Sequence, residues 1–258
     1  MSTANSKQAR YDIDELQAAL DAETKLRLEL EERLRRTQED FQEFIFNAAH
    51  DLREPLRTVN AYCELLTRAN QQHDAAEADQ FRRYIMEGTA KIQALVSGMG
   101  EYATACADSH YVLRTDVTDV LREALAAAPS SAERAPVITH DPLPTVRGDF
   151  EKLVKVFRHL FDNAFRYCDA PEPRIHVSSR RDGSDWVFMV RDNGPGIEHA
   201  YHERIFKPFK RLHGRQFPGV GLGLAFCQKA IESHGGRIWV ESLPGSGATV
   251  CFSLPAAD

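Results

Sequence analysis

The sequence predicts long N-terminal helices that assemble into a dimeric helical bundle, followed by a mixed α+β domain. Three observations predict this fold class. Residues 12–36 are rich in Glu, Arg, Leu and Ala and contain neither Gly nor Pro, which favours one continuous helix. Apolar residues then recur at three- and four-residue spacing up to about residue 105. Beyond residue 111, short β-like runs alternate with helical patterns and with Pro and Gly.

The composition excludes several classes of protein. The 258 residues are 43% hydrophobic, which is enough to bury a core. The net charge of -6, without a block of like charge, argues against nucleic-acid binding. The five cysteines lack C-x-x-C spacing and predict neither a disulfide framework nor a zinc site. No apolar run approaches the roughly 18 residues of a membrane span, so we expect a soluble chain in a reducing cytoplasm.

We interpret residues 1–11 as a flexible N-terminus and residues 12–37 as a coiled-coil helix. A heptad seam between residues 13 and 48 is apolar at eight of its eleven a and d positions. Glu23 and Arg27 interrupt it. We expect two chains to pair in parallel through this seam, and the alternative is a single amphipathic surface helix. The heptad seam consists of Ile13, Leu16, Leu20, Glu23, Arg27, Leu30, Leu34, Thr37, Phe41, Phe44 and Ala48.

Residues 38–105 predict a helical hairpin. One apolar stripe continues to about residue 68, and a second runs from Phe81 to Tyr102, with the polar loop "ANQQHDAAEA" (69–78) between them. Two helices bury little surface by themselves, so we expect the hairpin to dimerise into a four-helix bundle. Residues 106–111 are interpreted as a linker.

Residues 112–258 predict a second domain, an α+β sandwich with helices on one face of a largely antiparallel sheet. The sequence of this domain shows no internal repeat. The expected strands are 112–116, 136–140, 174–180, 186–192, 237–242 and 248–254, and the expected helices are 117–127, 149–166 and 221–234.

The stretch "FNAAHDLREPLR" (46–57) places a proline inside the hairpin's first helix. An α-helix advances about 100° per residue, so His50 is expected on the side opposite the apolar stripe, near Phe46 and Arg57. Pro55 should bend the helix, at a cost of about 3 kcal/mol in a helix interior. Asp51 can orient one imidazole nitrogen and leave the other as a nucleophile. The alternative is an ordinary surface histidine.

This stretch resembles the dimerisation and phosphoacceptor helix of two-component sensor histidine kinases, whose motif is His, an acid, two variable residues, a polar residue and Pro-Leu. The resemblance implies that His50 accepts a phosphoryl group and that Asp51 acts as its base or orienting partner. It also makes Phe46, Arg53 and Arg57 candidate docking residues. Kinases that dephosphorylate their partner often have Thr or Asn where this chain has Glu54. A carboxylate cannot donate the corresponding hydrogen bond to water, which argues against phosphatase activity.

A domain that phosphorylates His50 must bind ATP, and "FRHLFDNAFRY" (157–167) resembles the family's asparagine box. Asn163 offers an amide oxygen, a ligand suited to Mg²⁺. Arg166 can offset phosphate charge, and Tyr167 can lie against adenine. His159 stands where the family usually has a second Asn, which implies altered metal or phosphate contacts.

Three further segments resemble the family's boxes in the expected order. In "RDNGPGI" (191–197), Asp192 could accept a hydrogen bond from the exocyclic amine of adenine. The neighbouring glycines let the backbone approach the base. "ERIFKPFKRLHG" (203–214) resembles the phenylalanine box, with nearby cations that could reach phosphates. "PGVGLGLAFCQKAIESHGG" (218–236) places glycines before a helix whose N-H groups can bind anions. The residues implied in these segments are Asp192, Gly194, Gly196, Ile197, Phe206, Phe209, Lys210, Arg211, Arg215, Gly219, Gly221, Leu222, Gly223 and Leu224.

The closing "GSGATVCFSLP" (245–255) places Thr249 on a final strand, where its hydroxyl could support Asp192. Together the boxes resemble the Bergerat-type ATP-binding fold shared by histidine kinases, gyrase, the 90 kDa heat-shock chaperone and the MutL ATPases. "KRLHGR" and "HGGRIWVES" are similar to the phytochrome-associated group of histidine kinases. The resemblance covers roughly residues 38–255.

The resemblance implies an ATP-dependent protein histidine kinase that autophosphorylates His50 and passes the phosphoryl group to an aspartate of a response regulator. ATP and Mg²⁺ are the implied cofactors. The implied partners are a second copy of the chain, a receiver domain, and an upstream sensor domain or sensor protein. Two alternatives stay open: a nucleotide-binding dimer without phosphotransfer, and an ATP-hydrolysing chaperone or repair-type machine. The stimulus and the choice between cis and trans transfer stay open as well.

Overall fold

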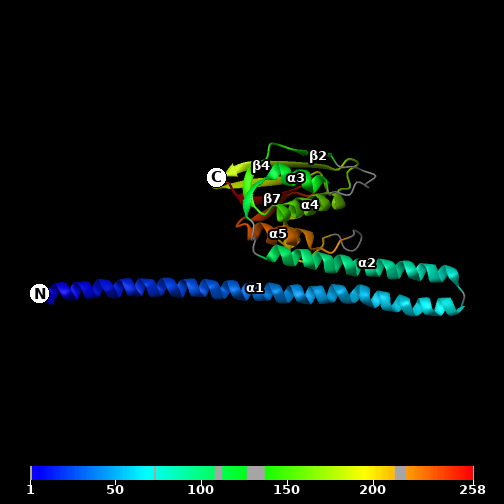
Figure 1. Cartoon of the computed structure of the whole chain (residues 1–258), viewed down its shortest axis with the longest axis horizontal. Helices are drawn as coiled ribbons and strands as arrows, with labels where there is room; N and C mark the ends of the chain where they lie inside the picture. The colour runs from blue at the N-terminus through cyan, green and yellow to red at the C-terminus, as the bar shows by residue number, and fades with distance from the viewer. Residues whose placement is uncertain (1, 73, 108–111, 127–136, 213–218, 258) are drawn as a thin grey trace. The chain divides into compact units, whose positions relative to one another are not determined.

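The computed structural model describes residues 2–72, 74–107, 112–126, 137–212 and 219–257 (Figure 1). Within these ranges no helix contains a stretch with the length and hydropathy needed to cross a bilayer. The helices are α1 (Ser2–Gln72), α2 (Ala75–Cys106), α3 (Val117–Ala126), α4 (Phe150–Tyr167) and α5 (Gly223–Ser233), with 3-10 turns η1 (His199–Tyr201) and η2 (Arg204–Phe206). The strands are β1 (Leu113–Asp116), β2 (Val137–His140), β3 (Thr145–Gly148), β4 (Arg174–Asp182), β5 (Asp185–Asp192), β6 (Ile238–Ser242) and β7 (Ala248–Pro255).

Between residues 20 and 46, most of the α1 side chains that the structure describes are exposed. Arg35 pairs with Glu32 and with Glu39, three and four residues away, a spacing that supports helices. α1 begins at Ser2, so residues assigned above to a flexible N-terminus are helical. Four apolar residues of the heptad seam stand exposed on this single chain, which is what an unpaired coiled-coil surface would present. They are Leu20, Leu30, Leu34 and Phe41.

The remainder of α1 packs against α2 as a helical hairpin. The ring of Tyr62 lies 4.6 Å from that of Tyr84, measured between centroids. Gly88 allows the helices to approach, because a Cβ there would stand 2.6 Å from Val59 Cγ2. The connection is shorter than the expected loop over 69–78. α2 already begins at Ala75, where Asp74 caps it by accepting a hydrogen bond from the N-H of Glu77 at 3.0 Å.

Pro55 lies inside α1 and does not interrupt it, since the helix runs on to Gln72. The proline is buried. Its carbonyl oxygen is 3.6 Å from the position that a Cβ on Gly88 would take. Burial against α2 is therefore one contribution that offsets the hydrogen bond that the Pro55 nitrogen cannot donate.

The second domain contains a five-stranded sheet in the order β2-β4-β5-β7-β6 and a two-stranded sheet of β1 and β3. All pairs are antiparallel except β2 and β4, which run parallel. Every strand and helix expected in this domain is present, with ends that differ by one or two residues. The sequence analysis missed β3, a four-residue strand whose partner β1 lies about 30 residues earlier in the sequence.

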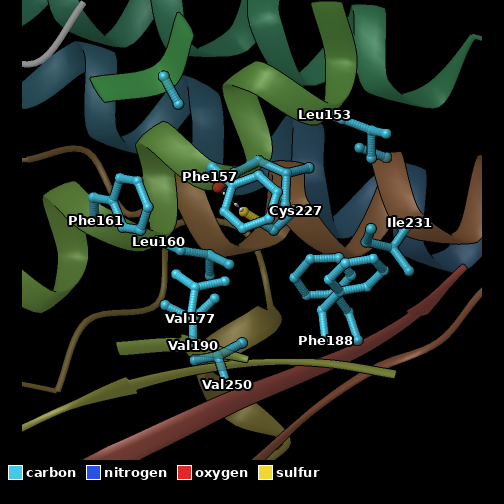
Figure 2. Close-up of a cluster of buried hydrophobic side chains, with 14 of the residues drawn as sticks. Leu153, Phe157, Leu160, Phe161, Val177, Phe188, Val190, Cys227, Ile231 and Val250 are labelled. Carbon is cyan, nitrogen blue, oxygen red and sulfur yellow. Dashed lines mark hydrogen bonds between the residues drawn. The ribbon is translucent and has the colours of Figure 1, made fainter. Parts of the chain in front are cut away.

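The core lies between the helices and the five-stranded sheet, as Figure 2 shows. From the helices, Phe157, Phe161 and Ile231 project toward the strands, where Val177 and Phe188 face them (Figure 2). The rings of Phe188 and Phe252 stack at 5.1 Å between centroids. This layer fixes α4 and α5 over one face of the sheet, which positions the residues of the pocket described next.

Candidate active site

A pocket of about 360 Å³ opens among α2, α4, the segment after β5, the glycine-rich segment before α5, and β7. This volume suits a small-molecule site, for which about 300 to 1,000 Å³ is typical. It brings together most of the residues that the sequence analysis assigned to nucleotide binding. Those that line it are Asn163, Arg166, Tyr167, Asp192, Gly194, Gly196, Ile197, Lys210, Arg211, Gly219, Gly221, Leu222, Gly223 and Leu224.

Asp192 lies at the end of β5 and is held by backbone groups. Its Oδ1 accepts hydrogen bonds from the N-H of Gly194 at 2.8 Å and from the N-H of Ala248 at 3.1 Å. Both bonds use one oxygen, so Oδ2 can accept from a ligand. Burial raises the pKa of Asp192, and these two N-H groups partly oppose the rise. A half-buried carboxylate with a fixed orientation is suited to accept a hydrogen bond from a single amine group of a ligand.

The last turns of α4 supply the polar wall of the pocket. Asn163 and Arg166 are three residues apart, and Tyr167 follows, so their side chains share one face of the helix. The guanidinium of Arg166 lies directly against Gly219, where a Cβ would collide with it. An amide oxygen, a cation and an aromatic ring thus face the same cavity.

The glycine-rich segment forms another wall and leads into α5, which begins at Gly223. Gly221 has a φ of 76°, a left-handed conformation that favours glycine. Its carbonyl accepts a hydrogen bond from the N-H of Phe209 at 2.9 Å. Phe209 is itself in a left-handed conformation, with a φ of 62°. Phe209 therefore anchors this segment through its backbone, and it does not line the pocket.

Two further residues assigned to the site from the sequence are not among the described residues that line the pocket. Phe206 is a core residue. Thr249 does not line the pocket, because β7 alternates and its neighbours Ala248 and Val250 face the cavity instead. The group from β7 that supports Asp192 is the backbone N-H of Ala248, one residue earlier than expected. Arg215 lies outside the described residues.

One wall of the pocket was not predicted from the sequence. Four residues of α2 line it, and a Cβ on one of them, Gly98, would stand 3.1 Å from both Val220 and Leu222. His159 of α4 also lines the pocket, and its Nε2 is 3.5 Å from Glu101 Oε2 of α2. No local pattern could have shown these contacts, since they join segments far apart in the sequence. The α2 residues are Ala94, Ser97, Gly98 and Glu101.

The described residues contain no cluster of three His, Cys, Asp or Glu side chains arranged for a metal ion. Asn163 is the oxygen donor that the sequence analysis assigned to Mg²⁺, and it faces the cavity beside Arg166. Mg²⁺ in proteins typically uses one or two protein ligands together with substrate phosphates and water. The donor set fits such an ion, bound jointly with a polyphosphate.

The phosphoacceptor motif lies on α1. His50 is exposed, and so are the three candidate docking residues Phe46, Arg53 and Arg57, with Phe46 71% accessible. Glu54 points toward α2, where its Oε2 lies 3.9 Å from Lys91 Nζ. The residue that departs from the family motif is therefore engaged in an ion pair within the hairpin.

Comparison with known proteins identifies the fold of the second domain. Residues 148–258 match the family described as histidine kinase-, DNA gyrase B-, and HSP90-like ATPase. This match lies within the C-terminal domain and covers less than half of the chain. The expected Bergerat-type nucleotide-binding fold is thereby confirmed, with long helices preceding an α/β ATP-binding domain.

Similar proteins extend the similarity to the helices. Cyanobacterial phytochrome A of Nostoc sp. is 39% identical over 86% of this chain, and the phytochrome-like protein Cph1 of Synechocystis sp. is 36% identical over 89%. The chain spans only 29% and 31% of these relatives' own lengths. The crystal structure of histidine kinase ThkA in complex with response regulator protein TrrA shares the fold, with a TM-score of 0.65 and 21% identity, and covers 86% of this chain and 64% of that one. The resemblance to sensor histidine kinases is confirmed.

Proposed function

We propose that this chain is the kinase core of a two-component sensor histidine kinase, which binds Mg-ATP in the pocket and transfers the γ-phosphoryl group to His50. The observation that carries the proposal is the convergence of Asp192, Asn163, Arg166 and the glycine-rich wall in one cavity. The same chain exposes a histidine in the phosphoacceptor motif on α1.

Each wall of the pocket has a role in binding ATP. Asp192 Oδ2 accepts a hydrogen bond from the exocyclic amine of adenine, while Oδ1 stays bound to the backbone. Tyr167 lies against the base. Backbone N-H groups at the start of α5, together with Arg166 and Lys210, neutralise the phosphates. Asn163 would hold Mg²⁺, which would supply positive charge to offset that of the phosphates.

The transfer step joins the two domains. An imidazole nitrogen of His50 attacks the γ-phosphorus, an N-P bond forms, and the bond to the β,γ-bridging oxygen breaks as ADP leaves. Asp51 orients the imidazole or accepts its proton. Positioning and charge neutralisation supply most of the rate. His50 belongs to the same chain or to its partner in a parallel dimer that forms through the heptad seam.

The phosphohistidine then donates its phosphoryl group to an aspartate of a response regulator. Exposed Phe46, Arg53 and Arg57 provide an apolar and cationic surface along α1 for a receiver domain. The complex of ThkA with TrrA supports this partner class. Because Glu54 pairs with Lys91 and cannot donate to an attacking water, we propose that the chain lacks phosphatase activity.

Incubation with γ-labelled ATP tests the kinase proposal. Wild-type chain should acquire a label that is lost in acid, and His50→Ala should acquire none. Equal labelling of both chains would contradict the assignment. A nucleotide-binding dimer without phosphotransfer is the second candidate, favoured by His159 and Glu54 at two family positions. It predicts ATP binding with no acid-labile label on either chain.

A further inference from the structure

The α2 helix contributes a carboxylate to a pocket that we assign to a polyanion. Glu101 is the acidic residue of α2 that lines the cavity, together with Ala94, Ser97 and Gly98. Its side chain is 46% exposed. Two other walls of this cavity, the end of α4 with Arg166 and the glycine-rich segment, are suited to phosphate, so the negative charge of Glu101 opposes a phosphate ligand.

Contacts on both sides hold Glu101 at this place. Its Oε2 lies 3.5 Å from Nε2 of His159, whose ring packs 4.9 Å from that of Phe226 in α5, measured between centroids. One turn earlier on α2, Gly98 lies against Val220 and Leu222 of the glycine-rich segment. α2 therefore contacts both walls of the pocket that bind phosphate in our proposal.

The surroundings keep Glu101 ionised. A hydrogen bond with His159 is the main cause that lowers its pKa, and the charges of His159, Lys155 and Arg158 add to this effect, while burial opposes it. A carboxylate with a lowered pKa stays negative at neutral pH. At 46% exposure its field is partly screened by water and salt, so its effect on a ligand is modest.

We propose that Glu101 is an affinity-determining residue of the nucleotide pocket, which lowers the affinity for ATP by charge repulsion while α2 lies against the glycine-rich segment. The proposal rests on the assignment of the pocket to ATP. Linkage requires the reverse effect as well, so that bound ATP weakens the contact between α2 and the C-terminal domain. The hairpin that carries the phosphoacceptor thereby modulates the site that supplies the phosphoryl group.

The test compares equilibrium binding of ATP, in the absence of Mg²⁺, to the wild-type 258-residue chain, Glu101→Gln and Glu87→Gln. Glu87 is an exposed residue of the same helix that does not line the pocket. Glu101→Gln should bind ATP about threefold to tenfold more tightly than wild type at low salt, with a ratio that falls toward one as salt screens the charge. Glu87→Gln should match wild type. Uncharged adenosine should bind wild type and Glu101→Gln equally.

Three results would overturn the proposal. An ATP affinity of Glu101→Gln that equals or falls below that of wild type would show that Glu101 does not repel ATP. An equal shift for ATP and adenosine would indicate a change in pocket shape instead of charge. The absence of ATP binding to every chain would overturn the proposed function together with this inference, which distinguishes that failure from the first two.

Discussion

In the proposed function Asp192 recognises the adenine base, although its buried position does not favour the stability of the fold. Burial raises its pKa, because removing the ionised carboxylate from water costs free energy. An amide in its place keeps an oxygen for the N-H groups of Gly194 and Ala248 but presents a donor to the adenine amine. Asp192→Asn should therefore weaken ATP binding at least about tenfold, the effect of an unmatched polar pair.

The same substitution should leave the thermal unfolding temperature unchanged or raised, because the desolvation of the charge is relieved. Calorimetric titration with ATP and thermal unfolding of the same samples check both parts. A large fall in unfolding temperature would mean that Asp192 is mainly structural.

His234 is a buried histidine outside the pocket that joins α5 to the start of α4. Its Nε2 accepts from the N-H of Asp149 at 2.8 Å, and its Nδ1 donates to the carbonyl of Ala230 at 2.6 Å. Burial lowers the pKa of His234, so the neutral ring is the folded form. The unfolded chain then binds more protons than the folded chain below the ordinary histidine pKa of about 6.5, and stability falls as pH drops through that value.

His234→Gln should remove this pH dependence. Wild type should lose unfolding free energy between about pH 7 and pH 5, and the variant should show a smaller slope over the same range, with stability at pH 8 lower by about 1–3 kcal/mol. Denaturant unfolding at several pH values measures both quantities. Identical slopes would exclude His234 as a source of acid sensitivity.

At the scale of elements, the hairpin depends on one small residue. A Cβ at Gly88 would stand 2.6 Å from Cγ2 of Val59, a β-branched side chain with little freedom to move. Gly88→Ala should destabilise the chain by about 1–3 kcal/mol, as overpacking does. At Gly100 of the same helix a Cβ would meet no atom within 4 Å, so Gly100→Ala should stabilise by up to about 1 kcal/mol. Changes of opposite sign in the free energy of urea unfolding for the two variants would support the close packing at Gly88. Equal changes would contradict it.

Local sequence patterns predicted those helices and strands whose own residues show a clear helical or β-strand pattern. The 3.6-residue periodicity of α4 and the β-like runs of β5 and β7 placed these elements to within one or two residues. The loop over 69–78 was overestimated because its residues are polar, whereas "AAEA" is a good helix former once Asp74 caps it. β3 was missed because its four residues acquire strand structure only by pairing with β1.

Pocket residues could be predicted where they belong to one continuous sequence motif. They could not be predicted where they depend on contacts between segments distant in sequence. The turn after β5 and the glycines before α5 carry their own chemistry, and both line the pocket. Thr249 was placed one residue away from the group that matters, because strand alternation decides which neighbour faces the cavity. His159 was recognised as a departure from the family, but its partner Glu101 could not be, since nothing in either segment encodes the contact.

At the scale of the whole molecule, the exposed heptad seam predicts a dimer. Leu34 occupies the seam and is 69% accessible, whereas Leu28 is off the seam and 60% accessible. Leu34→Glu should raise the dimer dissociation constant at least about tenfold, since a leucine buried in the interface contributes about 1.5–3 kcal/mol. Leu28→Glu should leave it unchanged. Light scattering over a range of concentrations measures the mass, and equal effects of both substitutions would contradict a paired seam.

The central claim is that the ATP pocket of the C-terminal domain phosphorylates His50 on α1. The most direct measurement is mass spectrometry of the 258-residue chain after incubation with Mg-ATP, with peptides prepared at alkaline pH to preserve phosphohistidine. We expect one phosphoryl group located on His50, and less of this modification in Asp192→Asn when the ATP concentration lies below the dissociation constant of that variant. A phosphoryl group at another residue, or unmodified His50 on a chain that binds ATP, would contradict the account.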